Sequence, residues 1–313
     1  MLRSMSASSW AFANGEIVPL EQARYWPNDL AIIYGDLVYE ATRTFRGEPF
    51  RLQAHVERLY RSLRYTHIDP GLSPEELTAA SLDVVAKNRP DLPDGSDMWI
   101  FHNITRGSHP DFMDIGRGDA GATVLIWTHE LWFKGWASKY ADGAHCVIPS
   151  VRQMDIATQD PRMKTRSRMF FALAEQEAHA LDPAAHALLL DGKGHIAEAS
   201  GANFMLVQDG TILTPRSGTG LSGVSLGTIH DLCNDLGIEI READLTLYDV
   251  YTADEALLSS TPFCVLPVTR VNGANVADGR PGDVFARLID TWSETVGIDI
   301  VEQARKQAQP KTT

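Results

Sequence analysis

Two short segments of the sequence carry the residue types that could do covalent chemistry. The segment 161–164 ends in Lys164, and the segment 196–204 places Glu198 on a short apolar run that is followed by small residues. A lysine amine forms a Schiff base with the aldehyde of pyridoxal phosphate, and a carboxylate beside the pyridine nitrogen keeps that nitrogen protonated. Lys164 and Glu198 are therefore candidates for these two roles.

Lysine is scarce in the sequence, which narrows the choice of a reactive amine. The pattern predicts a long apolar helix from about 164 to 181, with Lys164 at its start, where partial burial would make the amine available for attack. A solvated lysine is the competing interpretation, and the neighbours Arg162, Arg166 and Arg168 support it. The other six lysines follow a helix or lie in turns, in an aromatic stretch or in the polar tail: Lys87, Lys134, Lys139, Lys193, Lys306 and Lys311.

Three further features could bind a phosphate group, although no Walker-type loop is present. The segment 221–225 leads through a glycine into a helical pattern, and the free N–H groups at a helix N-terminus bind anions. Thr261 ends a predicted strand with a hydroxyl, and Arg58 supplies positive charge. Each also has an ordinary interpretation, as a helix cap, a strand end and a solvated arginine, so the three gain weight only together.

Length, charge and cysteine content limit the class of protein. A chain of 313 residues favours two domains, and a net charge of −13 argues against a nucleic-acid or anionic-membrane partner. Cys146, Cys233 and Cys264 are widely spaced, which predicts reduced thiols in a cytoplasmic protein and neither a disulfide framework nor a metal site. The N-terminal segment lacks the apolar core of a signal peptide, and no run of about eighteen apolar residues predicts a membrane span.

Residues 1–130 are predicted to form a smaller N-terminal α/β domain. Asn14-Gly15 is typical of a two-residue hairpin turn, and 73–76 has the pattern of a capping box that opens a helix. The predicted strands cover about 30–34, 37–39, 42–45, 98–105 and 121–128, and the predicted helices cover about 53–66 and 74–87.

Residues 131–142 are predicted to connect the domains, and 143–313 to form a larger C-terminal domain that holds Lys164. Asp209-Gly210 is a strong hairpin signal, and the polar tail from Gln303 is expected to fray. Besides the helix from 164 to 181, helices are predicted at about 225–236 and 282–296, and strands at about 185–190, 195–198, 203–208, 212–213, 256–259 and 265–270.

Taken together, these segments resemble the class IV, or fold-type IV, pyridoxal-phosphate aminotransferases. The resemblance spans about residues 12–275 and rests on the segments 34–40, 55–59, 163–164, 198–204, 221–225 and 260–261. It implies a two-domain fold of mixed α+β and α/β type, the D-amino-acid aminotransferase-like class. It also implies pyridoxal 5'-phosphate as cofactor, a homodimer, and ping-pong transfer between an amino donor and a keto acceptor.

The resemblance also implies roles for individual residues. Lys164 would carry the cofactor as a Schiff base and then move a proton, and Glu198 would pair with the pyridine nitrogen. The phosphate and the side of the ring would be held by a further set, which comprises Arg58, Asn203, the backbone amides of Val224 and Ser225, and Thr261.

The residues expected to contact the substrate give mixed signals. They are Tyr34, Tyr39, Arg43 and Phe101. Arg43 stands where branched-chain enzymes carry an arginine near the substrate carboxylate. Tyr39 favours the (R)-amine transaminases, and Phe101 replaces a tyrosine that is expected in branched-chain enzymes.

Other segments are more similar to the D-amino-acid enzymes, namely 104–107 and 175–179, although Asp111 stands where such an enzyme would have an arginine. We expect a branched-chain-type α-amino acid as donor and an α-keto acid as acceptor. The alternatives are an (R)-selective amine transaminase, a D-amino-acid aminotransferase, an aminodeoxychorismate lyase-like enzyme and a silent cofactor-binding protein. The presence of both Lys164 and Glu198 argues against the last of these.

Overall fold

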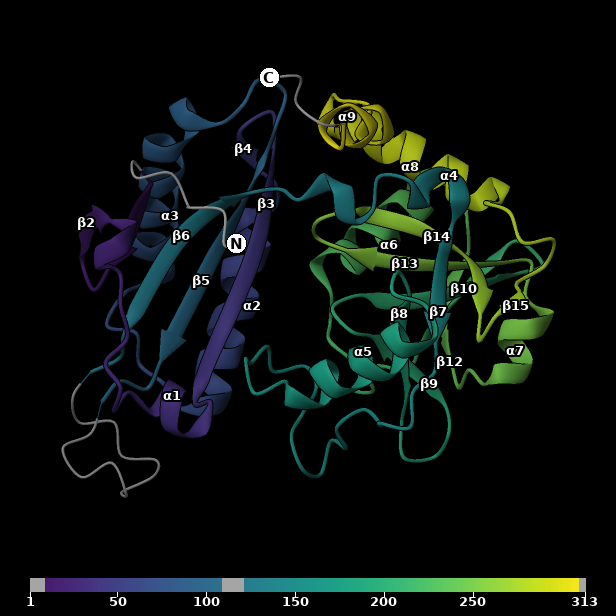
Figure 1. Ribbon diagram of the computed structural model, residues 1–313, viewed down its shortest axis with the longest axis horizontal. Coiled ribbons are helices and arrows are strands. Elements are labelled where there is room, and N and C mark those ends of the chain that lie inside the picture. The colour runs from purple at the N-terminus through teal and green to yellow at the C-terminus, as the bar shows by residue number, and fades with distance from the viewer. Residues whose placement is uncertain (1–8, 109–120, 310–313) are drawn as a thin grey trace. The chain divides into compact units, whose positions relative to one another are not determined.

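The structure is a computed structural model of the chain, and it describes residues 9–108 and 121–309. The chain divides into two compact units (Figure 1). Unit 1 comprises Met1–Leu131 and Met163–Ser167, and unit 2 comprises Trp132–Arg162 and Arg168–Thr313. Lys164, which was expected in the C-terminal domain, therefore groups with unit 1, and most of the predicted connection 131–142 groups with unit 2.

Unit 1 is built on an antiparallel sheet that has six strands within the described residues, in the order β2-β1-β6-β5-β3-β4. The predicted hairpin turn joins the first two strands, and both of its residues, Asn14 and Gly15, have positive φ angles. The strands are β1 (Trp10–Ala13), β2 (Glu16–Pro19), β3 (Leu37–Phe45), β4 (Glu48–Pro49), β5 (Met98–Thr105) and β6 (Val124–Glu130).

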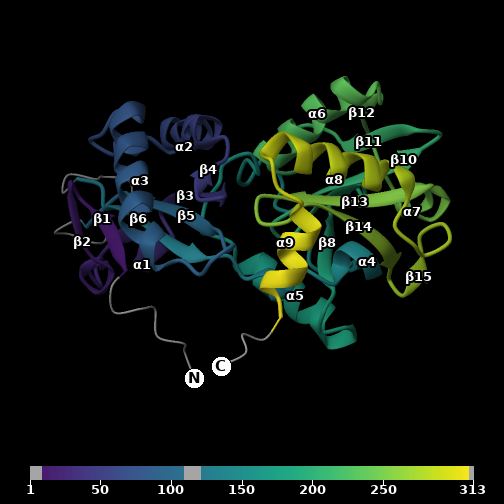
Figure 2. The ribbon, with the colours of Figure 1, turned by 90° about the horizontal axis from the view of Figure 1, so that it is seen from above.

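Two helices, α2 (Leu52–Thr66) and α3 (Pro74–Asn88), cover one face of this sheet (Figure 2). The predicted capping box is present, because Ser73 Oγ accepts from the Glu76 amide and the Glu76 carboxylate accepts from the Ser73 amide. Alternate strand residues meet the apolar stripes of the helices in one core, which includes Val38, Val56, Leu59, Leu63, Leu77, Val84, Ile100, Ile104 and Ile126. The 3-10 turns η1 (Leu20–Gln22) and η2 (Arg89–Asp91) complete the unit.

The prediction of a strand at 30–34 is wrong, because these residues form the short helix α1 (Leu30–Tyr34). Asp29 caps its N-terminus by accepting from the Ala31 amide at 2.8 Å, and Gly35 ends it with a φ of 70°. The capping residues at both ends thus outweigh the strand propensity of a short apolar run.

The prediction of a helix from residue 164 is also wrong at its start, because α5 begins only at Met169. Residues 164–166 run extended along the edge of β3 that β4 leaves open. The Tyr39 amide donates to the Lys164 carbonyl at 2.9 Å, and Val38 forms a bridge with Thr165. Backbone N–H and C=O groups at the edge of a strand form hydrogen bonds with this segment, although its own sequence pattern is helical.

Unit 2 contains a mixed sheet that has nine strands within the described residues. Its main path is β12-β11-β10-β13-β14-β7-β8-β9, and β15 pairs with β14. The pairs β11–β12, β14–β7 and β7–β8 are parallel, and the other pairs are antiparallel. The strands are β7 (Ala144–Val147), β8 (His186–Leu190), β9 (Ile196–Ala199), β10 (Asn203–Gln208), β11 (Thr211–Pro215), β12 (Ile240–Ala243), β13 (Glu255–Ser260), β14 (Cys264–Val271) and β15 (Ala274–Asn275).

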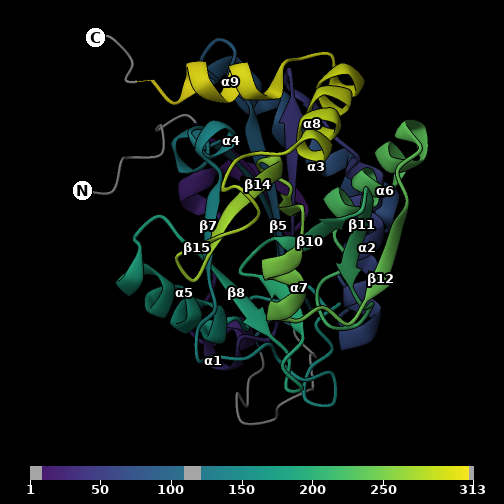
Figure 3. The same ribbon diagram turned by 90° about the vertical axis from the view of Figure 1, so that its right-hand side faces the viewer.

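Helices pack on several strands of this sheet (Figure 3). Helices α6 (Val224–Leu236) and α8 (Asp283–Val296) contact β13, and α5 (Met169–Leu181) contacts β7 and β8. The remaining elements are η3 (Phe133–Gly135), α4 (Lys139–Asp142) and α7 (Leu247–Thr252). Among the described residues, no helix is both long enough and apolar enough to cross a membrane.

The prediction of fraying from Gln303 is wrong for residues 303–307, which are helical. Helix α9 (Ile300–Gln307) is capped by Asp299, whose carboxylate accepts from the Glu302 amide at 2.8 Å. Ile300 and Gln303 are buried, so tertiary packing holds a polar segment whose sequence alone gives little helical signal.

Candidate active site

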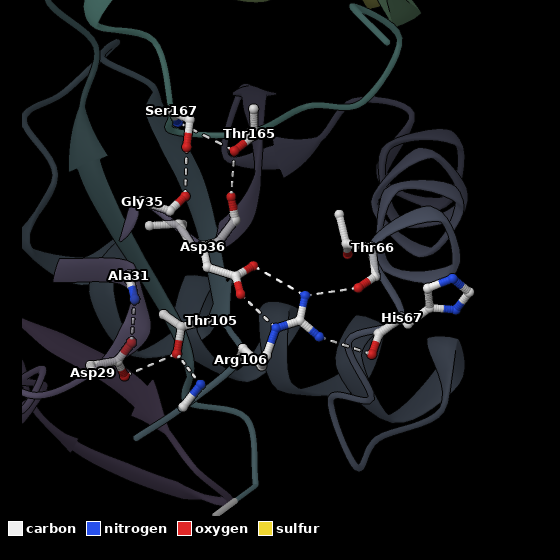
Figure 4. A network of polar contacts seen from close by, with 12 residues as sticks. Asp29, Ala31, Gly35, Asp36, Thr66, His67, Thr105, Arg106, Thr165 and Ser167 are labelled. Carbon is white, nitrogen blue, oxygen red and sulfur yellow. Dashed lines mark hydrogen bonds and ion pairs between the residues drawn. The ribbon is translucent and has the colours of Figure 1, made fainter. Parts of the chain in front are cut away.

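The segment that carries Lys164 is fixed to unit 1 by its backbone and by the two hydroxyl side chains that follow. Thr165 Oγ1 donates to the Leu37 carbonyl at 2.8 Å, and Ser167 Oγ donates to the Gly35 carbonyl at 2.7 Å (Figure 4). A side chain at Gly35 would collide with Ser167, so the glycine permits this close approach. The Lys164 amine is thereby presented from a backbone that is hydrogen-bonded on both sides of it.

The Lys164 side chain is half-buried and lies against an aromatic surface. Its Nζ is 4.6 Å from the centroid of the Tyr39 ring. Because side chains alternate along a strand, this surface is the face of the sheet opposite α2 and α3. The rings of Phe101 and Trp127 stack there at 5.3 Å, and Trp99 lies 5.7 Å from Phe101. We call Tyr39, Trp99, Phe101 and Trp127 the aromatic face.

Arg166 also lies on the aromatic face. Its guanidinium carbon is 3.8 Å from the Tyr39 ring centroid and 5.9 Å from that of Phe101. Its Nε donates to Asn103 Oδ1 at 3.4 Å, and Asn103 Nδ2 donates to the Tyr25 hydroxyl at 3.0 Å. Burial raises the pKa of Tyr25, so the phenol at the end of this chain of contacts stays protonated.

Arg43, the residue expected to meet a substrate carboxylate, is only 2% exposed. Its Nη2 lies 3.9 Å from Asp97, its Nε donates to the Thr44 carbonyl at 3.1 Å, and its guanidinium carbon is 3.8 Å from the Phe45 ring centroid. Asp97 is itself fully buried. The charge of Arg43 therefore already faces a protein carboxylate.

Arg58, expected to hold the phosphate, lies buried on the helix side of β3. Its guanidinium donates to Glu40 in a two-point contact, with Nε–Oε2 at 2.8 Å and Nη2–Oε1 at 2.7 Å. His55 Nδ1 lies 3.1 Å from the same carboxylate. Burial alone would raise the pKa of Glu40, but Arg58 and His55 outweigh it and hold that pKa well below its usual range.

This partner of Arg58 could not be assigned from spacing, although the family segment at 34–40 contains it. Glu40 lies on a strand and Arg58 on a helix. Only the packing of this helix on this strand shows that the two side chains meet. The contact of His55 with Glu40 supports the packing of α2 on β3. Burial lowers the pKa of His55, which favours the neutral ring in this position.

In unit 2, Glu198 is 6% exposed on β9, and neutral amides are among the groups that hold it. Gln153 Nε2 donates to its Oε1 at 2.5 Å, and the Leu221 amide donates to its Oε2 at 3.0 Å. A neutral amide orients a carboxylate without contributing an opposite charge, which suits a partner for a protonated ring nitrogen. Gln153 lies outside every motif of the sequence, so its role was missed.

The Leu221 backbone links Glu198 to Asn203, because its carbonyl accepts from Asn203 Nδ2 at 2.7 Å. Gly223 follows as the N-cap of α6, and an added Cβ there would collide with Asn203 Oδ1. A hollow lined in part by Asn203, Leu221, Ser222 and Gly223 lies beside this loop. The glycine lets the helix begin here, with the amides of the next two residues free of side-chain caps.

Those two residues are Val224 and Ser225, whose amides were expected to bind phosphate. Thr261 directly follows β13, in which Ser259 is the strand partner of Asn203. Unit 2 therefore places Asn203 beside both the start of α6 and the end of β13. Unit 1 places Lys164 beside Tyr39, whereas Tyr34 is 41% exposed at the end of α1 and Asp111 lies outside the described residues.

The side chains present suit the predicted cofactor. Lys164 offers an amine, Glu198 a fixed anion, and the start of α6 a set of N–H groups at the positive end of a helix dipole. A protein with these groups on a two-domain mixed fold has the chemistry of a pyridoxal-phosphate enzyme. The family model for amino-transferase class IV matches residues 37–271, and the chain belongs to this family.

Similarity to known proteins extends over nearly the whole chain. The D-alanine aminotransferase of Listeria monocytogenes serotype 4b (strain F2365) is 28% identical over 284 residues, which cover 90% of this chain and 94% of that protein. The branched-chain-amino-acid aminotransferase of Escherichia coli (strain K12) is 27% identical over 289 residues, which cover 90% and 91%.

Among solved structures, the branched-chain amino acid aminotransferase of T.th. complexed with N-(5'-phosphopyridoxyl)-L-glutamate has a TM-score of 0.82 and 28% identity, and the match covers 92% of this chain and 94% of that chain. The predicted fold class, the pyridoxal-phosphate cofactor and the transaminase activity are thereby confirmed.

Proposed function

We propose that the protein moves the amino group of a branched-chain-type α-amino acid to an α-keto acid. The observation that carries this proposal is the position of the Lys164 amine against the aromatic face, 4.6 Å from the Tyr39 ring centroid. An apolar surface beside the reacting nitrogen suits an aliphatic side chain. The branched-chain enzymes among the similar proteins support the same donor class.

The residues divide the chemistry between them. When bound, pyridoxal phosphate supplies the electron sink that stabilises negative charge at the substrate Cα. Lys164 would attach the cofactor and then take and return the Cα proton. Glu198 would hold the proton on the pyridine nitrogen, and the amides of Val224 and Ser225, with Thr261 and Arg58, would bind the phosphate. Asn203 would hold the loop at Leu221 that leads into α6.

A D-amino acid or an (R)-amine is the second candidate donor. Tyr39 and Phe101 favour it, and so does the similarity to D-alanine aminotransferases. The Thr105-Arg106-Gly107 segment is a weaker guide, because Arg106 makes a two-point contact with Asp36 and donates to the Thr66 and His67 carbonyls (Figure 4). These contacts give Arg106 a structural role within unit 1.

Visible absorbance of the bound cofactor tests the donor directly. Separate additions of L-leucine, D-alanine and (R)-1-phenylethylamine to the holoenzyme should show bleaching with L-leucine, and Lys164→Ala should abolish turnover with every donor. Bleaching by D-alanine or the (R)-amine alone would replace the proposed donor with the second candidate. Release of pyruvate from an amino substrate without any keto acceptor would indicate the lyase.

We also infer a homodimer in the cytoplasm. Trp26, Ile32 and Ile33 are exposed on and beside α1, and a second copy of the chain would cover such a group of apolar side chains. The three cysteines are buried and form no disulfide, and burial raises the pKa of Cys146 to about 12 and that of Cys233 to about 11. Sedimentation equilibrium tests the dimer, and a monomer at micromolar concentration would contradict it.

A further inference from the structure

We propose that Ser62 is a positioning residue for Lys164, an inference that rests on the proposed function because it takes Lys164 as the amine that carries the cofactor. Ser62 lies on α2 and is 3% exposed. Its Oγ accepts from the Lys164 amide at 3.2 Å, although 102 residues separate the two in the sequence. This contact lies outside every motif that indicated the cofactor site.

The Ser62 hydroxyl is oriented by its own helix. A serine hydroxyl has one proton to donate and can accept through its lone pairs. Ser62 Oγ donates its proton to the Arg58 carbonyl at 3.3 Å, one turn earlier on α2, and a lone pair accepts from Lys164. The direction of the hydroxyl is therefore set within α2, and it determines where the Lys164 amide lies.

The Lys164 backbone is held at both of its polar groups by two different elements. Its amide donates to Ser62 on α2, and its carbonyl accepts from the Tyr39 amide on β3 at 2.9 Å. Bonds on either side of the Cα restrict both backbone rotations, so they fix the direction in which the side chain leaves the chain. The hydroxyls of Thr165 and Ser167 anchor the residues that follow (Figure 4). Ser62 supplies the anchor on the N-terminal side of the Lys164 Cα.

This anchor lies where the chain enters unit 1. The segment of unit 1 that carries the lysine begins at Met163, so Lys164 is its second residue. The end of a segment opens more readily than its middle. Met163 packs against the apolar core of unit 1, but apolar packing is non-directional and does not fix the rotation of the next peptide group. A directional hydrogen bond at the Lys164 amide does.

The position of this amide matters for the chemistry because the amine lies at the end of a side chain whose origin is the Lys164 Cα. A displacement of about 1 Å at a reacting group can lower a rate about a hundredfold. Ser62 also joins the backbone of Lys164 to the turn of α2 that carries Arg58, the residue expected to bind the phosphate. One hydroxyl thus sets the amine relative to that turn.

The test compares Ser62→Ala and Ser62→Thr with the matched control Ser81→Ala. Ser81 is also a buried helix serine, and its Oγ donates to the Leu77 carbonyl at 2.7 Å and lies 2.8 Å from His102 Nε2. Its removal deletes the same kind of helix hydroxyl far from Lys164 in the contact network. Threonine keeps the hydroxyl, and Thr66 on the same helix already makes the bond to the carbonyl four residues earlier.

The first measurement is hydrogen exchange of the Lys164 amide in the apoprotein, followed by mass spectrometry with fragmentation to single residues. Exchange should be about two- to tenfold faster in Ser62→Ala and close to the wild-type rate in Ser62→Thr and Ser81→Ala. The Arg166 amide, which donates to the Leu37 carbonyl at 3.4 Å, is the internal control. An unchanged rate at Lys164 in Ser62→Ala would overturn the proposal.

The second measurement is the kinetics of the holoenzyme with whichever donor the wild type accepts. Ser62→Ala should lower kcat about tenfold with normal cofactor content and a KM for the keto acceptor that changes by less than about twofold. Ser62→Thr should keep most of the wild-type kcat, and Ser81→Ala should keep all of it. A wild-type kcat in Ser62→Ala, or an equal loss in Ser81→Ala, would contradict a positioning role.

Failure of the proposed donor leaves this comparison intact. If only D-alanine or the (R)-amine is a donor, the same variants are compared with that donor, and a selective loss of kcat in Ser62→Ala still supports the positioning role. Turnover that survives in Lys164→Ala would refute the proposed function itself, and the positioning role with it.

Discussion

Replacement of Glu40 by glutamine should destabilise unit 1 strongly, although the change is isosteric. Glu40 is fully buried, and both of its oxygens accept hydrogen bonds. Oε2 accepts from Arg58 Nε, and Oε1 accepts from Arg58 Nη2 and from the Ala41 amide at 2.8 Å. Whichever way the glutamine amide is turned, its NH2 group must face a donor. The Arg58 charge also remains buried without a full counter-charge.

The magnitude follows from the burial of the pair. Removal of one partner of a buried ion pair destabilises a protein by about 3–5 kcal/mol. A domain of this size has a total stability of about 5–15 kcal/mol, so the loss is a large share of it. With a shift of about 2–4 °C for each kcal/mol, the melting temperature should fall by about 10 °C.

The assay is urea unfolding of the apoprotein at pH 7, followed by far-UV circular dichroism. Glu57→Gln is the matched control, because Glu57 is exposed on the helix that carries Arg58 and its substitution should change the unfolding free energy by less than about 0.5 kcal/mol. The pKa of Glu40 is lower in the folded state than in the unfolded state. Its contribution to the free energy of unfolding is therefore present above its pKa in the unfolded chain and is lost as the pH falls through its pKa in the folded protein. If Glu40→Gln unfolds at the same urea concentration as Glu57→Gln, the assignment of this pair as a main support of unit 1 is refuted.

Two further predictions concern the start of α6 and the core of unit 1. Gly223→Ala should weaken cofactor binding about tenfold, because the new Cβ would push Asn203 aside. In the control Gly227→Ala the new Cβ meets no atom within 4 Å, so binding should be unchanged. Equal affinities of the two variants, measured by cofactor titration of the apoproteins, would contradict this prediction. Burial lowers the pKa of His102 to about 4. As the pH falls from 6.5 to 4, His102 is therefore protonated in the unfolded chain and still neutral in the folded one. Over this range the free energy of unfolding should decrease by about 1.4 kcal/mol for each pH unit. His102→Gln should lose this part of the pH dependence in urea unfolding at pH 7 and pH 5, and an unchanged slope would exclude it.

Features that depend on a few neighbouring residues could be predicted from the sequence. The turns at Asn14-Gly15 and Asp209-Gly210 both have positive φ angles, the capping box at Ser73 has both of its hydrogen bonds, and Gly237 ends α6 at a φ of 65°. Each is set by local sterics or by hydrogen bonds within one turn. The motifs and their order along the sequence were also sufficient to predict the family and the cofactor, and to select Lys164 and Glu198 as candidate residues.

Features that join distant segments could not be predicted in this way. The helical pattern after Lys164 gave no sign that an open edge of β3 would hold 164–166 in extended form. The partners of Arg43, Arg58 and Glu198 likewise come from other elements, so residue type and spacing do not select them.

The sequence by itself thus determined the class of chemistry, because that chemistry needs particular side chains in a particular order. Only the tertiary structure decided how each charge is used. It set Arg43 against Asp97 and the Lys164 amine against the Tyr39 ring, and a buried cation that faces a carboxylate differs in binding capacity from one that lies against an aromatic ring. That difference is one of surroundings, which form only when segments far apart in the chain pack together.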